Sequence, residues 1–181
     1  MQQAGYQVRF GAGLEGLRDC AADADVIIWV DALPGTFDDD RSTPPARDVT
    51  LLTLLGKAPV GATLIATDLP TSRAAAAWVL DFQTDVQRRL AIAVITASAA
   101  FAVEDFLAAG SVIDALSELG LDATSPEAAA AEAAYRGLRN AVAHLITASV
   151  AGRAQTVPAE LTRVNPHAGV ADVAVIRDER T

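Results

Sequence analysis

The stretch DVIIWVDA, residues 25–32, decides the class of fold. Its apolar residues run without a polar break from Val26 to Val30 and stop at Asp31. A strand with one wet face alternates apolar and polar residues, whereas a strand covered on both faces, as in a parallel sheet, is apolar throughout. The sequence therefore predicts a buried strand that ends at an acidic residue.

Two further stretches have the same character. ATLIATD (residues 62–68) ends at Asp68, and LAIAVITA (residues 90–97) is apolar along almost its whole length. YQVRF (residues 6–10) predicts a short first strand, and for VADVAVIRD (residues 170–178) a last strand is favoured over a helical turn.

Helical signals fill the intervals between these strands. They lie in residues 13–20, 49–56, 71–89, 98–120, 125–138 and 140–152. The clearest start is SPE at residues 125–127, where a capping serine precedes a proline and an acidic residue. Strands that alternate with helices predict an α/β fold of three layers. We expect a single domain over residues 1–181, with a mostly parallel sheet, helices on both of its faces and a helical C-terminal half.

Composition limits the partners of the chain. The net charge of −9 and the isoelectric point near 4.5 disfavour nucleic acid and anionic membranes. The single cysteine, Cys20, excludes a disulfide framework and favours a reducing compartment, so we expect a cytoplasmic protein. Whether it forms a homo-oligomer is left open. Residues 34–47 are rich in proline and aspartate, which predicts a flexible loop.

Acidic residues stand where the predicted strands end. Asp31 and Asp68 close two of them, and Glu104 and Asp105 follow the third by a few residues. If the three strands are parallel neighbours, these acids meet at the carboxyl edge of the sheet, where open α/β sheets bind ligands. Carboxylates grouped there suit Mg²⁺, a hard cation commonly held by a few protein oxygens and a substrate phosphate. The pattern therefore predicts Asp31, Asp68, Glu104 and Asp105 as candidate magnesium ligands.

Thr71, Ser72 and Arg73 are expected at the same edge, where the next helix begins. Free N–H groups, two hydroxyls and a guanidinium could together hold a phosphate. Each feature also has a structural explanation, because threonine and serine cap helices and first-turn acids stabilise the helix dipole. Only a shared edge would favour metal-assisted phosphate chemistry over capping.

Other residues with reactive side chains are weaker candidates for a functional site. His144 is expected to be partly buried on an apolar helix face, His167 to lie in a loop, and Cys20 to be structural. The run DDDR (residues 38–41) is expected to be solvated. The sequence has no zinc-ligand spacing and no glycine-rich nucleotide loop after a strand.

The segment FAVEDFLAAGSVIDALSELG (residues 101–120), followed by SPEAAAAEAAYRGLRNAVAHLITASVAGR (residues 125–153), resembles the C-terminal half of the 2-phosphosulfolactate phosphatase (ComB-type) family. DVIIWVDALPGT (residues 25–36) is similar to a strand of that family, and RAAAAWVLDFQ (residues 73–83) to one of its helices. The resemblance implies an α/β fold, Mg²⁺, and hydrolysis of a phosphate ester on a route to coenzyme M. It places Asp31, Glu104 and Asp105 at the family's acidic positions.

Departures from the family leave a second function open. Pro34 stands where the family has an arginine, its T-T-N-G-T loop has no counterpart in residues 33–61, and TASAA (residues 96–100) replaces a glycine-rich turn. The expected function is therefore a Mg²⁺-dependent phosphatase of a small anionic phosphorylated metabolite, similar to 2-phosphosulfolactate. The alternative is a catalytically degenerate homologue that acts as a binding or assembly protein.

Overall fold

The computed structural model describes residues 3–33, 51–154 and 173–179, which share one five-stranded sheet. The strands are β1 (Val8–Ala12), β2 (Val26–Val30), β3 (Thr63–Thr67), β4 (Ile92–Thr96) and β5 (Ala174–Arg177). Their order across the sheet is β1-β4-β2-β3-β5, with the first four parallel and β5 antiparallel to β3. The predicted α/β class with a mostly parallel sheet is confirmed.

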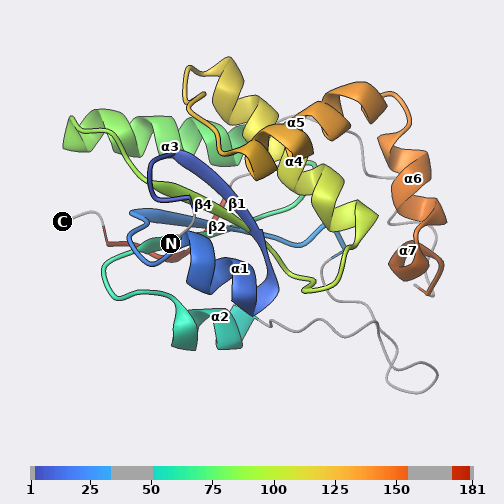
Figure 1. Cartoon of the computed structure of the whole chain (residues 1–181), viewed down its shortest axis with the longest axis horizontal. Coiled ribbons are helices and arrows are strands. Elements are labelled where there is room, and N and C mark those ends of the chain that lie inside the picture. Colours follow the sequence, from blue (N-terminus) through green and yellow to red (C-terminus); the bar gives the residue numbers. More distant parts are fainter. Residues whose placement is uncertain (1–2, 34–50, 155–172, 180–181) are drawn as a thin grey trace.

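Seven helices lie within the described ranges: α1 (Gly13–Cys20), α2 (Leu51–Lys57), α3 (Ser72–Val86), α4 (Val103–Glu118), α5 (Pro126–Leu138), α6 (Val142–Ala148) and α7 (Val150–Ala154). In Figure 1, α1 and α2 lie on one side of the sheet, and α3, α4 and α5 lie on the other. The three layers expected from the sequence are therefore present, and residues 103–154 are almost entirely helical.

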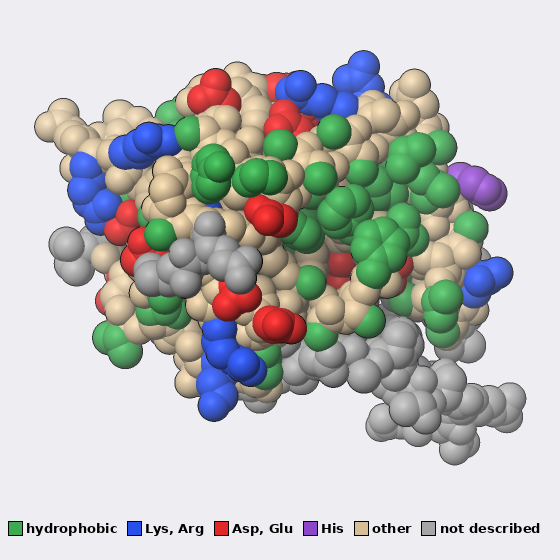
Figure 2. Space-filling view, in the orientation of Figure 1, with side chains coloured by type: hydrophobic (Ala, Val, Ile, Leu, Met, Phe, Trp, Pro, Cys, Tyr) green, Lys and Arg blue, Asp and Glu red, His purple; other side chains and the backbone are tan. Residues whose placement is uncertain are grey.

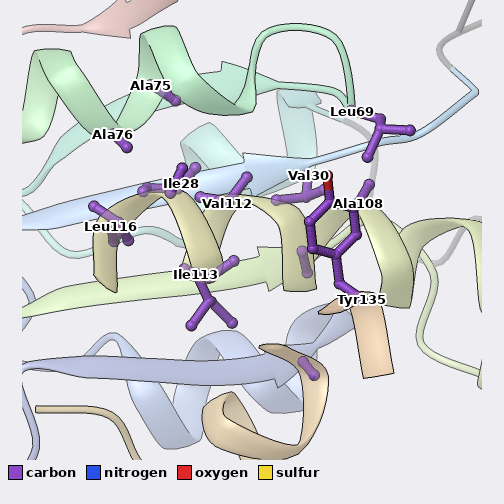
Figure 3. Close-up of a cluster of buried hydrophobic side chains, with 14 of the residues drawn as sticks. Ile28, Val30, Leu69, Ala75, Ala76, Ala108, Val112, Ile113, Leu116 and Tyr135 are labelled. Atoms are coloured by element: carbon purple, nitrogen blue, oxygen red, sulfur yellow. The ribbon is translucent and has the colours of Figure 1, made fainter. Parts of the chain in front are cut away.

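The strands β2, β3 and β4 send alternate side chains into two separate cores. On β2, Ile28 contributes to the core under α3 and α4, whereas Ile27 and Trp29 contribute to the core under α1 and α2. Figure 3 shows the first of these cores, with Ile28 and Val112 drawn between the ribbons of the sheet and the helices. The unbroken apolar run of β2 is the consequence, because both of its faces are covered.

The helix α4 is buried around nearly its whole circumference. A helix packed on the sheet alone would bury one apolar stripe, but buried side chains occur at almost every position from Glu104 to Leu116. Even Ser111 and Asp114 are buried, whereas Phe106 is only partly buried. The reason is that α4 packs against α3 and α5 as well as against the sheet.

The C-terminal helices differ from the prediction in one respect. The expected cap of α5 is confirmed, since the Ser125 hydroxyl accepts a hydrogen bond from the N–H of Ala128 at 3.2 Å. The single helix expected over residues 140–152 is wrong, because Ser149 adopts extended backbone angles and separates α6 from α7. Its hydroxyl accepts from the N–H of Gly152 at 2.9 Å, so Ser149 caps the second piece.

Arg9 is a charged residue buried in β1, only 3% exposed. Its guanidinium donates to the carbonyl oxygens of Tyr6, Cys20 and Ala4 and forms an ion pair with Asp23. Every donor direction is therefore used within the protein, and the end of α1 is fixed to the sheet.

Some sequence predictions concern residues that the structure does not describe. The predicted flexible loop at residues 34–47 and the run at residues 38–41 lie outside the described residues, as does His167. Within the described ranges, no helix combines the length and apolar character that crossing a membrane requires.

The contact between α4 and α5 yields a stability prediction. A Cβ at Gly110 would lie 2.2 Å from the carbonyl oxygen of Ala131, so α5 approaches α4 at a distance that only glycine permits. We expect Gly110→Ala to lower the free energy of unfolding by about 2 kcal/mol in urea titrations, within the range of about 1–3 kcal/mol for overpacking.

The matched control is Gly137→Ala in α5, where an added Cβ meets nothing within 4 Å. Because alanine is the better helix former, this variant should gain up to about 1 kcal/mol. A Gly110→Ala protein as stable as wild type would mean that α4 and α5 do not pack at this point.

Candidate functional site

The carboxyl ends of three neighbouring strands meet at one edge of the sheet. The last residues of β2, β3 and β4 are in register, since Val30 pairs with Thr67 on one side and with Thr96 on the other. Asp31 and Asp68 directly follow two of these strand ends. The parallel arrangement on which the sequence prediction of a shared edge depended is therefore present.

Asp105 joins two of the strand ends. It lies in the first turn of α4, is only 4% exposed, and accepts three hydrogen bonds. Its Oδ1 accepts from the N–H of Ala32 at 3.0 Å, and its Oδ2 accepts from the N–H and hydroxyl of Ser98 at 3.2 and 2.8 Å. Because a carboxylate has about four acceptor positions, most of its capacity is already used.

Asp31 lies beside this junction and is partly buried. Its Oδ1 accepts from the N–H of Leu33 at 3.1 Å, which turns the chain as it leaves β2. The Ala32 N–H that Asp105 binds belongs to the next residue, so the structure brings Asp31 and Asp105 to the same place.

Asp68 is occupied by its own turn. Its Oδ1 accepts from the N–H of Thr71 at 2.9 Å and from the Thr71 hydroxyl at 2.6 Å. In return, the N–H of Asp68 donates to the Thr71 oxygen at 3.0 Å. The two residues satisfy each other ahead of α3, as in a capping arrangement.

Ser72 and Arg73 turn away from the edge. The Ser72 hydroxyl is buried and lies 2.9 Å from that of Ser111 on α4, while also donating to the carbonyl oxygen of Leu69. Arg73 forms an ion pair of 3.1 Å with Glu118, the last residue of α4. The structure therefore does not bring these two side chains to Asp31 and Asp105.

Glu104 differs from its neighbour. Its side chain is 6% exposed, and no hydrogen bond or ion pair joins its carboxylate to another described residue. No fully buried side-chain oxygen or nitrogen in the described ranges lacks a partner, so the Glu104 oxygens retain contact with solvent. The helix dipole offsets only about 0.3–1 kcal/mol in the first turn, whereas burying an unpaired charge costs several kcal/mol.

This donor set fits a cation held by few protein ligands. Among residues 3–33, 51–154 and 173–179, no three His, Cys, Asp or Glu side chains group as a metal site. Mg²⁺, however, is commonly held by one or two carboxylates together with water and substrate phosphate. Asp31 and Glu104 are carboxylates of the type that this smaller requirement needs, whereas a site built on all four predicted acids is not formed by the described residues.

An aromatic group next to the edge was not singled out from the sequence. The rings of Phe10 and Phe101 both pack against Phe106, with centroids 5.7 and 5.4 Å apart, and Phe101 is 78% exposed. Figure 2 shows apolar side chains gathered over the part of the surface formed by α4 and α5. The pair of phenylalanines in AFAVEDF was the available signal.

The other sequence candidates are peripheral. His144 is exposed on α6 rather than partly buried as expected. Cys20 is buried, and its Sγ lies 3.3 Å from the carbonyl oxygen of Phe10, in keeping with the structural role expected. Burial, followed by the charge of Asp19, raises the pKa of its thiol to about 11.

No protein-family model matches this chain, and no curated protein is significantly similar to it.

The hydrogen bonds of Asp105 give a test of its structural role. Asp105→Ala leaves three donors without their acceptor, so we expect the free energy of unfolding to fall by about 3 kcal/mol. Asp81→Ala is the control, because Asp81 is exposed on α3 and should change stability by less than about 0.5 kcal/mol. Equal stabilities for the two variants in urea titrations would contradict this role.

The raised pKa of Cys20 makes a prediction about reactivity. At pH 8 the thiol of the folded protein is almost entirely protonated, since its pKa is about 11, and it should react slowly with iodoacetamide. The rate should rise as the pH approaches 11, and unfolding in urea at pH 8 should accelerate alkylation strongly. Rapid alkylation of the folded protein at pH 8, followed by mass spectrometry, would show that Cys20 is accessible and ionised.

Proposed function

We propose that the carboxyl edge of the sheet binds one Mg²⁺ through Asp31 and Glu104 and acts on a small anionic phosphoester. The observation that carries this proposal is the Glu104 carboxylate, which is nearly buried and has no partner among the described residues. Although its oxygens retain contact with solvent, a charge this enclosed is compensated more fully by an ion or a hydrogen bond than by limited hydration. A cation at the edge would supply the compensation, and the resemblance to 2-phosphosulfolactate phosphatases agrees with it.

The residues around the edge would then divide the work. Asp105 holds the residues after β2 and β4 and the start of α4 in one position, so the first turn of α4, which carries Glu104, is fixed near the edge. The N–H groups in the first turn of α3 would donate to a phosphate, whereas the side chains of Ser72 and Arg73 are engaged elsewhere. Bound Mg²⁺ supplies the charge that polarises a phosphoryl group and lowers the pKa of a water molecule.

A second function is favoured by a different observation. Asp68, Asp105 and Arg73 are all satisfied by other groups of the protein, which is what a catalytically degenerate homologue would show. In that case the chain keeps the frame of a phosphatase and acts as a binding or assembly protein without turnover.

Calorimetric titration with Mg²⁺ separates the two functions. Wild type should bind Mg²⁺, and Glu104→Gln should weaken binding at least about tenfold, because it removes a charged oxygen ligand. Without Mg²⁺ the same variant should be as stable as wild type or slightly more so, since a buried charge with no partner is removed. Phosphate release from 2-phosphosulfolactate and other small phosphoesters should require Mg²⁺ and fall in the variant.

Glu127→Gln is the matched control. Glu127 occupies the second position of α5, as Glu104 does in α4, but it is exposed. Its substitution should leave Mg²⁺ binding unchanged. If wild type binds no Mg²⁺ and releases no phosphate, the phosphatase proposal is wrong and the non-catalytic homologue is the better explanation.

A further inference from the structure

A hollow lies on the face of the sheet opposite to α4. It has a volume of about 420 Å³ and is lined by residues of α1, the end of α2 and the turns after them, namely Leu14, Leu17, Arg18, Ala22, Lys57 and Pro59. Small-molecule sites commonly have volumes of about 300–1,000 Å³. The hollow is therefore large enough for a small ligand.

The floor of this hollow is apolar and fixed. Leu17 is 3% exposed and belongs to the core under α1 and α2, together with Leu54 and Ala58. Leu14 packs against the same core and is partly buried. The apolar part of the lining is thus held in place by the packed core beneath it.

The rim of the hollow carries two cations that are exposed. Arg18 closes α1 and Lys57 closes α2, and neither forms an ion pair with another described residue. Most arginines of the described ranges differ in this respect, since Arg9, Arg73, Arg88, Arg136 and Arg177 each pair with an acid. Figure 2 shows a small group of basic side chains, with acidic side chains next to it, at the lower edge of the molecule, over the region that α1 and α2 occupy in Figure 1.

Arg18 and Lys57 could also have a role that involves no ligand, either at the helix dipoles or beside nearby acids. Cations near helix C-termini stabilise the helix dipole by about 0.3–1 kcal/mol, which explains each residue separately. Glu15 and Asp19 are near Arg18 in sequence, but both are exposed and form no ion pair with it. Neither explanation accounts for two cations from different helices at the mouth of one apolar hollow.

We propose that this hollow binds a small amphipathic carboxylate, of the class of medium-chain fatty acids. Its hydrocarbon chain lies against Leu14, Leu17 and Pro59, and its carboxylate lies between Arg18 and Lys57. The site is separate from the carboxyl edge of the sheet, so it holds whether or not that edge hydrolyses a phosphoester. The two cations favour an anionic head group at this point, against the repulsion that the net charge of −9 exerts on anions elsewhere.

Calorimetric titration with decanoate below its micelle concentration tests the proposal. Decanol has the same chain without charge, and decyltrimethylammonium has the opposite charge. We expect decanoate to bind at least about tenfold more tightly than either, because the carboxylate interacts with both cations. Equal binding of all three would show nonspecific adsorption, and no binding of decanoate would also overturn the proposal.

Variants of the rim give the decisive comparison. Arg18→Gln and Lys57→Gln should each weaken decanoate about three- to fivefold, as expected for an exposed ion pair, and the double variant more than either. Arg139→Gln should have no effect, because Arg139 is exposed at the end of α5, away from the hollow. Decanoate affinity unchanged in the double variant would overturn the proposal.

Lys57 offers an independent readout, since it is the only lysine in the sequence. Decanoate should slow its modification by an amine-specific reagent, followed on the Lys57 peptide by mass spectrometry, whereas decanol should not. Equal rates with and without saturating decanoate would place the carboxylate somewhere other than beside Lys57.

Discussion

The buried carboxylate of Asp105 fixes the start of α4 against the sheet, and much of the remaining packing depends on that position. Its hydrogen bonds to Ala32 and Ser98 connect the residues that follow β2 and β4, which are adjacent parallel strands. Hydrogen bonds to a charged acceptor are directional and contribute about 1.5–3 kcal/mol each when buried. The helix that leaves this junction then packs on α3, α5 and the sheet, so an error at its first turn would be carried along its length.

The strands could be predicted from the sequence because strands that are buried on both faces consist of apolar residues without a break. In β2 and β4 every residue is buried, and the two runs are correspondingly apolar. The order β1-β4-β2-β3-β5 could not be predicted, since several arrangements bury the same runs equally well. The burial of α4 around its whole circumference could not be predicted either. It depends on α5 and α6, which are formed by later, alanine-rich segments, and the pattern of these segments does not specify how they pack.

The candidate site also has one part that the sequence could predict and one part that it could not. That Asp31 and Asp68 should lie at one edge follows from parallel strands alone, and it required no knowledge of side chains. The sequence could not predict which groups bind these side chains. Asp68 accepts a hydrogen bond from Thr71 in its own turn, and Arg73 forms an ion pair with Glu118 at the far end of α4. That Glu104 and Asp105 should differ could be predicted, because adjacent residues of a helix point about 100° apart, but the partners that Asp105 binds could not.

The distribution of charge links the two proposed sites. On a chain with a net charge of −9, Arg18 and Lys57 line one hollow and pair with no acid among the described residues, whereas Arg9, Arg73 and Arg88 each form an ion pair. The carboxyl edge has the opposite character, with a nearly buried glutamate that no described cation neutralises. The two regions lie on different sides of a sheet whose central strands carry only apolar or hydroxyl side chains. Each region therefore favours a ligand of the opposite charge, which would be a cation at the edge and an organic anion between α1 and α2.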